Sequence, residues 1–136
     1  MPTTEAEPIR VAVGVIWRDD LIFIAQRPDH LHQGGLWEFP GGKIQSGESA
    51  ARALVRELEE EIGIQVHGED AEYLFAIPWD YTDKQVMLET YLVNKFSGDP
   101  GGKEGQTVKW VRPEELGEYQ FPEANARILS WILETN

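Results

Sequence analysis

The stretch from Gly42 to Ile64, GKIQSGESAARALVRELEEEIGI, constrains the fold most, because it has the pattern of one helix with both ends marked. Ser49 is a favourable N-cap, and Gly63 suits the left-handed position just past a helix end. The sequence therefore predicts a helix from Ala50 to Ile62. At about 100° per residue, its apolar arc consists of Ala51, Leu54, Val55, Leu58 and Ile62.

A second arc of this helix carries Glu57, Glu60 and Glu61, at a spacing that makes their carboxylates converge. An acidic run of this kind is usually a solvated face. Here the like charges repel one another, and Glu60 and Glu61 lie near the helix C-terminus, where the helix dipole disfavours anions. A bound cation would offset both effects, and clustered carboxylate oxygens suit Mg²⁺ or Mn²⁺.

The same stretch resembles the Nudix box, in which a glycine and a glutamate precede the pattern Arg-Glu-aliphatic-x-Glu-Glu-x-Gly-aliphatic. The matching residues are Gly42, Glu48, Arg56, Glu57, Leu58, Glu60, Glu61, Gly63 and Ile64. Nothing departs from the box. The resemblance implies a Nudix fold, an α/β/α sandwich with a mixed β-sheet, and metal-dependent hydrolysis of a phosphoanhydride bond.

Apolar runs predict strands before this helix. Ile9 to Trp17 and Leu21 to Gln26 are expected to form a hairpin about a turn at Arg18 to Asp20, and Leu36 to Phe39 a short strand. Pro40 to Lys43, PGGK, is expected to be a sharp turn that lets the main chain approach a ligand closely.

Further strands and a second helix are expected after the helix from Ala50 to Ile62. A turn at Asp80 to Lys84 separates the first two strands, and the Gly-rich loop from Ser97 to Gln106 precedes the last one. Strands on both sides of an internal helix, with a helix at the end, predict an α/β fold whose mixed sheet is covered on both faces. The expected strands are Tyr73 to Pro78, Gln85 to Phe96 and Lys109 to Arg112, and the expected helix is Ala124 to Glu134, with Ile128, Leu129, Ile132 and Leu133 on its apolar side.

Length and charge bound the class of protein. With 136 residues, the chain is expected to be a single domain, residues 1–136, with a flexible tail at Met1 to Pro8. A net charge of −12 argues against binding polymeric nucleic acid, which normally requires a basic surface. No apolar run approaches the roughly 18 residues of a membrane span. We expect a cytoplasmic protein; the sequence does not fix its oligomeric state, although a monomer is favoured.

The resemblance extends beyond the box, in three segments that are similar to those of the MutT branch of the family, the 8-oxo-dGTP pyrophosphohydrolases. They are LWEFPGGK at Leu36 to Lys43, KEGQ at Lys103 to Gln106 and FPEAN at Phe121 to Asn125. The resemblance implies hydrolysis of 8-oxo-dGTP to 8-oxo-dGMP and pyrophosphate by attack at the β-phosphorus. This activity would clean the nucleotide pool and avoid mutation during DNA replication.

The resemblance also assigns roles to acidic residues. Metal ligation is implied for Glu57, Glu60, Glu61 and Glu104, with the carbonyl of Gly41 or Gly42. The ion is expected to be Mg²⁺, with Mn²⁺ as a possible substitute. Glu57 and Glu104 both remain candidates for the base that takes the proton of the attacking water. An ion pair between Glu48 and Arg56 is expected to hold the helix and the preceding loop in register.

Five residues are expected to bind the nucleotide. Arg27 and Lys43 resemble phosphate-binding positions, while Asn125 and the main chain at Phe39 resemble positions that recognise the base. Lys84 stands where a MutT-like chain is expected to have an arginine near the base. Because lysine cannot make a planar bidentate contact, this departure puts the base preference in question. His30 and His32 are interpreted as ordinary loop histidines, since they lack a third metal ligand.

Two alternatives share most of these features. A Nudix hydrolase of CTP or of methylated dCTP would have the same box and differ only in its base pocket. A non-catalytic base-recognition module, like the Nudix-like domain of an adenine DNA glycosylase, would have a broken box, whereas every glutamate of the box is present here.

Overall fold

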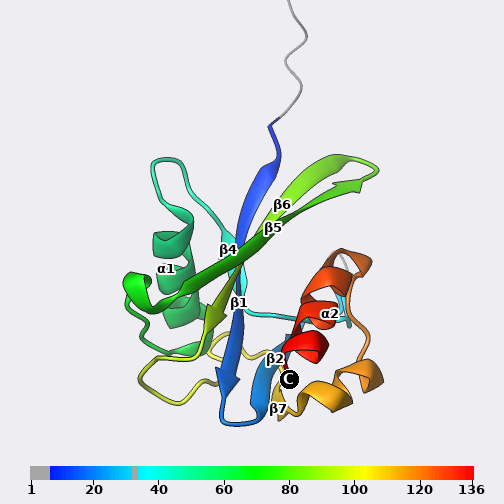
Figure 1. The fold of residues 1–136 in the computed structure, drawn as a ribbon. Helices are drawn as coiled ribbons and strands as arrows, with labels where there is room; N and C mark the ends of the chain where they lie inside the picture. Colours follow the sequence, from blue (N-terminus) through cyan, green and yellow to red (C-terminus); the bar gives the residue numbers. More distant parts are fainter. Residues whose placement is uncertain (1–6, 32–33) are drawn as a thin grey trace, which may run out of the picture.

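The computed structural model of the protein describes residues 7–31 and 34–136 (Figure 1). Most of the predicted tail at Met1 to Pro8 lies outside these residues, and so does His32. Within the described ranges, no helix is long and apolar enough to cross a membrane.

Strand β1 (Ile9–Arg18) organises the sheet because it pairs along both of its edges. On one edge it runs parallel to β6 (Lys84–Val93), in a register from Ile9 opposite Val86 to Ile16 opposite Val93. On the other edge it pairs antiparallel with β4 (Gly41–Lys43) near its start and with β2 (Leu21–Gln26) at its end. The sheet is therefore mixed, as the sequence predicts.

The remaining strands extend this sheet to seven strands. Strand β5 (Glu72–Tyr81) forms an antiparallel hairpin with β6. Strands β3 (Trp37–Glu38) and β7 (Val108–Val111) both pair with β2, on opposite edges of it. Strand β2 is thus paired along both edges. Its residues are apolar on both faces because Ile22 and Ile24 pack in the core on one side of the sheet and Phe23 packs in the core on the other.

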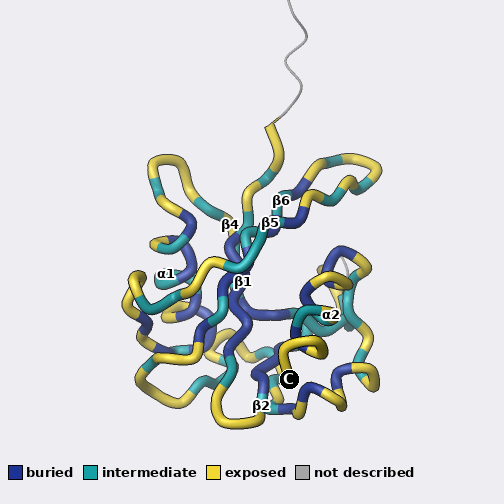
Figure 2. Tube along the Cα trace, in the orientation of Figure 1, coloured by how far each residue is buried: buried dark blue, intermediate teal, exposed yellow. Residues whose placement is uncertain are grey.

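The two helices, α1 (Ala50–Ile62) and α2 (Ala126–Thr135), cover opposite faces of the sheet (Figure 1). Side chains of β1 alternate between them, and its middle is buried (Figure 2). Ala12 and Ile16 pack in the core under α1, whereas Val13 and Val15 pack in the core under α2. This arrangement is the expected α/β/α sandwich. Short 3₁₀ turns connect the layers: η1 (Gly68–Asp70), η2 (Pro113–Glu118) and η3 (Glu123–Asn125).

Helix α1 has the predicted ends. The Ser49 hydroxyl accepts a 3.2 Å hydrogen bond from the Arg52 main-chain N–H, and Gly63 has φ of 77°, where a side chain would be strained. Leu58 and the other large residues of the predicted arc, Leu54 and Ile62, are fully buried. Ala53, which the predicted arc omits, is fully buried as well.

The structure corrects several predicted boundaries. Gly41 to Lys43 is a strand rather than part of a sharp turn, because its glycines let β4 lie against β1. A Cβ atom on Gly41 would overlap with the Ala12 carbonyl group. Strand β5 continues past Pro78 to Tyr81, and helix α2 begins at Ala126 after η3. Leu133, expected on the apolar side of that helix, is 55% exposed.

Replacing Gly41 by Ala should therefore lower the free energy of unfolding by about 1 to 3 kcal/mol, because β1 and β4 must move apart. The matched control is Gly117→Ala in η2, where a Cβ would meet no non-neighbouring atom of the described chain within 4 Å. Urea unfolding curves measure both values. Equal midpoints for the two variants would contradict the close approach at Gly41.

Candidate active site

A cavity of about 260 Å³ opens on the face of the sheet that α2 covers. Its floor is apolar, because β1 and β6 both place aliphatic side chains there. Pro122 and Ala124 line it from the segment before α2. The aliphatic floor consists of Ile9, Val11, Val13, Val86 and Leu88.

All five residues predicted to bind the nucleotide line this one cavity. They come from separate elements: Arg27 follows β2, Phe39 follows β3, Lys43 is on β4, Lys84 begins β6 and Asn125 ends η3. Cationic side chains therefore surround a cavity with an apolar floor, an arrangement that suits a flat base with an anionic extension.

Asn125 could serve either as the N-cap of α2 or as a residue of the cavity. It stands at the N-cap position of α2, yet its side chain makes no capping hydrogen bond within the described structure. It is only 8% exposed and lines the cavity. The segment that carries it is held by Phe121, whose ring stacks on Phe39 at 5.0 Å with an interplanar angle of 19°. Asn125 therefore borders the cavity and does not cap the helix with its side chain.

The sequence analysis missed two polar residues of the cavity, Glu38 and Tyr81. Glu38 accepts a 3.3 Å hydrogen bond from Arg27, and burial raises the pKa of its carboxyl group against the opposing effect of Arg27. Lys84 lies with its Nζ 5.7 Å from the centre of the Tyr81 ring, within cation–π range. Glu38 lies within the LWEFPGGK segment, which was the available signal; Tyr81 became visible only because β5 is longer than predicted.

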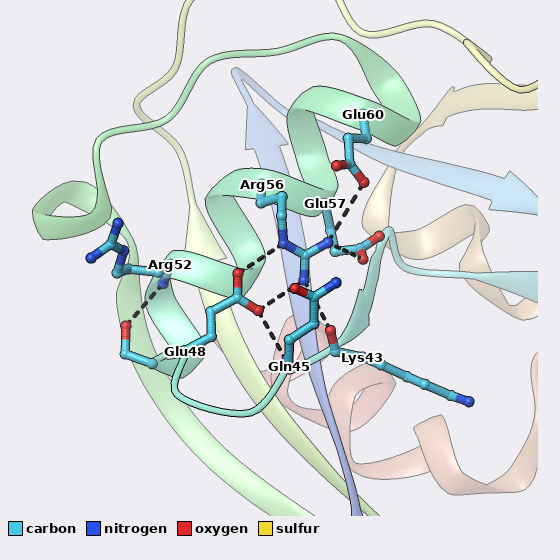
Figure 3. Close-up of polar contacts among 8 residues, drawn as sticks. Lys43, Gln45, Glu48, Arg52, Arg56, Glu57 and Glu60 are labelled. Atoms are coloured by element: carbon cyan, nitrogen blue, oxygen red, sulfur yellow. Dashed lines mark hydrogen bonds and ion pairs between the residues drawn. The ribbon is translucent and has the colours of Figure 1, made fainter.

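Arg56 forms the predicted ion pair with Glu48 and extends it (Figure 3). Its Nε and Nη2 donate to the two Glu48 carboxylate oxygens, each at 2.8 Å. Its Nη1 donates to Glu57 at 2.8 Å, and Nη2 also reaches the Lys43 carbonyl at 3.1 Å. Hydrogen bonds from Arg56 and the Gln45 main chain lower the pKa of Glu48 to about 2. One guanidinium thus joins α1, the loop before it and β4.

The glutamates of α1 have three different environments. Glu57 lies against Gly42, where a Cβ atom would overlap with its carboxylate group. The Glu60 side chain is 59% exposed, 3.6 Å from Arg56 (Figure 3). Glu61 is buried, with 9% exposure. Strand β4 therefore separates the cavity, lined by Lys43, from the glutamate side of α1.

Of the carboxyl groups in this region, the buried Glu61 has the most strongly shifted pKa. Burial raises its pKa to about 8, with further contributions from the negative charges of Glu38, Glu104 and Glu57, while a backbone hydrogen bond from Gly41 opposes the shift. Glu104 belongs to the exposed loop between β6 and β7. Carboxylates from three separate segments thus act on a single buried one.

This donor set fits a hard divalent cation, because carboxylate oxygens suit such ions and a cation would offset the burial and repulsion at Glu61. As the side chains lie, however, no three His, Cys, Asp or Glu residues in the described ranges are close enough together to hold an ion. Glu57 is engaged by Arg56, and the Glu60 side chain lies 3.6 Å from Arg56 and is 59% exposed, whereas Glu61 is buried. His30 is exposed in the loop after β2 and is no part of this group.

The Glu61 shift predicts a pH dependence of stability in the absence of divalent ions. Between about pH 4.5 and 8 the folded state holds a proton that the unfolded state has released, so the free energy of unfolding should fall as pH rises, by at most about 1.4 kcal/mol per pH unit. Glu61→Gln should flatten this slope. The control is Glu59→Gln, at an exposed position of the same helix. Urea unfolding in EDTA from pH 5 to 8 measures both, and an unchanged slope in Glu61→Gln would contradict the shift.

The chain is similar to known proteins in both sequence and structure. The family model described as the NUDIX domain matches residues 12–131. The 8-oxo-dGTP diphosphatase of Haemophilus influenzae is 40% identical over 126 residues, which cover 92% of this chain and 91% of that protein. The CTP pyrophosphohydrolase of Escherichia coli is 38% identical over 121 residues, which cover 89% and 88%.

A solved structure gives the same result for the fold. A MutT structure from a study of Aliivibrio salmonicida and Vibrio cholerae has a TM-score of 0.84 and 40% identity, over 96% of this chain and all of that one. The residues matched by the family model contain the whole box, the cavity lining from Val13 to Asn125, all of α1 and the first part of α2. The chain therefore belongs to the Nudix hydrolase family.

Proposed function

We propose that this single-domain Nudix hydrolase converts 8-oxo-dGTP to 8-oxo-dGMP and pyrophosphate. The observation that carries the proposal is the position of Asn125, buried at a cavity that Arg27 and Lys43 also line, directly across β4 from the glutamates of α1. A base in the cavity would extend its phosphates toward those glutamates. The Haemophilus influenzae relative, which bears the name 8-oxo-dGTP diphosphatase, supports this substrate. A substrate of the nucleotide pool implies a cytoplasmic location.

Divalent-metal dependence is general in this family, and we propose Mg²⁺ as the ion, with Mn²⁺ as a substitute. Glu57, Glu60, Glu61 and Glu104, with the carbonyl of Gly41 or Gly42, would hold it. When bound, the ion would neutralise phosphate charge and activate the attacking water. Binding requires Glu60 and Glu104 to turn inward, because their side chains are exposed as they lie.

Side chains of the protein would bind the phosphates, recognise the base and receive the proton of the attacking water. Arg27 and Lys43 would neutralise and orient the phosphates, and Asn125 can both donate to and accept from the edge of a purine. Two residues remain candidates for the base that receives the water proton. Glu57 has its carboxylate fixed by the 2.8 Å bond from Arg56, whereas Glu104 is on an exposed loop. Attack at the β-phosphorus, implied by the MutT-like segments, would make the nucleoside monophosphate the leaving group and place the oxygen of the attacking water in pyrophosphate.

A second candidate substrate is CTP. Two observations favour it: Lys84 replaces the arginine expected near the base, and the Escherichia coli relative named CTP pyrophosphohydrolase is nearly as similar as the 8-oxo-dGTP diphosphatase. Lysine offers a point charge instead of a planar fork, so it discriminates less by shape.

An assay of pyrophosphate release with Mg²⁺ tests the proposal on 8-oxo-dGTP, dGTP, CTP and 5-methyl-dCTP. We expect the highest kcat/KM for 8-oxo-dGTP, and a higher value for CTP would select the alternative. The same reaction in ¹⁸O-water should place the label in pyrophosphate. Label found only in the monophosphate would show attack at the α-phosphorus and refute the proposed reaction path.

Asn125→Ala should reduce the preference for 8-oxo-dGTP over dGTP, expressed as a ratio of kcat/KM values, by roughly 10-fold, because an oriented amide pair is worth about 1 to 3 kcal/mol between matching and mismatching bases. Its melting temperature should change little, since its side chain caps no helix in the described structure. Asn94→Ala, at an exposed position after β6, is the matched control. A lowered melting temperature with an unchanged ratio would make Asn125 a structural residue.

A further inference from the structure

The loop that carries Glu104 is fastened to the C-terminal end of α1. The Gly101 N–H donates to the Ile62 carbonyl at 3.0 Å, and the Lys103 N–H donates to the Glu61 carbonyl at 3.2 Å. The loop then closes on itself, because the Gly105 N–H donates to the Gly102 carbonyl at 3.0 Å. A loop with an exposed tip is therefore anchored beside the helix turn that contains the predicted metal ligands.

The Gln106 side chain adds a bridge of a different kind. Its Nε2 donates to the Glu61 carbonyl at 3.0 Å, and its Oε1 accepts from the Glu104 main-chain N–H at 2.9 Å. One planar amide thus joins the main chains of two predicted metal ligands that belong to different segments. The orientation of the amide is fixed, because a flipped amide would set oxygen against oxygen and N–H against N–H.

Gln106 is itself held on its other side by the sheet. The carbonyl of the next residue, Thr107, accepts a 2.9 Å hydrogen bond from the Gln26 N–H at the end of β2. Gly102 packs so closely that a Cβ atom there would overlap with the Gln106 carbonyl group and come within 3.2 Å of Oε1. The main chain that carries the Gln106 amide is therefore held in place. A residue that positions another residue must itself be fixed in this way.

The bridge has a chemical reason to exist. Glu104 lies close enough to Glu61 and Glu38 for its charge to act on both carboxyl groups, so repulsion from their charged forms, which an ion would bind, favours moving the exposed Glu104 away. The hydrogen bond from the Glu104 N–H to Gln106 opposes that movement at the main chain. The side chain stays free to turn toward an ion.

We infer that Gln106 is a positioning residue of the metal site, whose amide keeps Glu104 in register with Glu61 so that both can ligate one divalent ion. The inference rests on the metal ligands of the proposed function. Gln106 touches neither substrate nor ion in this role, and acts only through Glu104.

Gln106→Met tests this, because it keeps the length of the side chain and removes both hydrogen bonds. We expect the Kd for Mn²⁺, followed by electron paramagnetic resonance without substrate, to rise about 10-fold. With Mg²⁺, kcat for 8-oxo-dGTP should fall about 10-fold while KM stays within about twofold, since the cavity is unchanged. Gln65→Met is the matched control: Gln65 is exposed and pairs with Ser97, near the start of the same loop, through main-chain atoms alone.

A double-mutant cycle separates positioning from plain stabilisation of the loop. In a Glu104→Gln background, Gln106→Met should cause no further rise in the Kd for Mn²⁺, because the residue it positions no longer ligates strongly. Equal losses in both backgrounds, or no loss in either, would overturn the inference.

A second variant covers the case in which Gln106→Met unfolds. Gln106→Glu keeps the acceptor for the Glu104 N–H but faces the Glu61 carbonyl with an oxygen, so it should weaken Mn²⁺ binding while circular dichroism shows a folded chain. Unchanged Mn²⁺ affinity in this variant would also overturn the inference. Failure of the wild type to hydrolyse any nucleotide would instead refute the proposed function, because Mn²⁺ binding is measured without substrate.

Discussion

The close packing of β4 against the backbone of β1 at Gly41 and against the Glu57 side chain of α1 at Gly42 is the constraint on which the site depends. Strand β4 lies between β1 and α1 with no side chain at either glycine, since a Cβ atom would overlap with Ala12 on one side and with Glu57 on the other. The cavity and the glutamates of α1 can therefore be neighbours across a single thin strand. A bulkier strand would separate the two halves of the site.

Few basic side chains offset the repulsion among the carboxylates near β4. The chain has 24 acidic and 12 basic residues, yet around α1 one guanidinium contacts Glu48, Glu57 and Glu60 together. Arg56 is suited to this task because its planar fork can satisfy a carboxylate with two parallel bonds and still donate elsewhere. Glu61 lies beyond its reach and remains both buried and repelled. The site therefore holds one carboxyl group whose charged form the protein alone does not stabilise, and an external cation would supply that stabilisation.

Sequence reasoning recovered the parts of the structure that local rules decide. The ends of α1 follow from Ser49 and Gly63, and the layers follow from apolar periodicity. The nucleotide side of the site came from resemblance: nothing in the local pattern brings Arg27, Lys84 and Asn125 to one cavity. What was missed depends on tertiary contact. A glycine pair has the same sequence signature in a turn and in a strand that must pack closely, and Gln106 has a role only because the loop meets the end of α1.

The parallel pairing of β1 with β6 has a consequence for how the site assembles. Val11 and Val13 meet Leu88 and its neighbours across a strand pair whose members lie far apart along the chain, with the entire box between them. Contacts of such long sequence separation close late, because loop entropy must be overcome before they form. A chain shortened to end before Lys84 would contain the complete box and α1 but would lack Val86 and Leu88, two of the five residues of the cavity floor. Catalytic motif and base recognition are thus encoded in different stretches of the chain and become one site only when β6 pairs with β1.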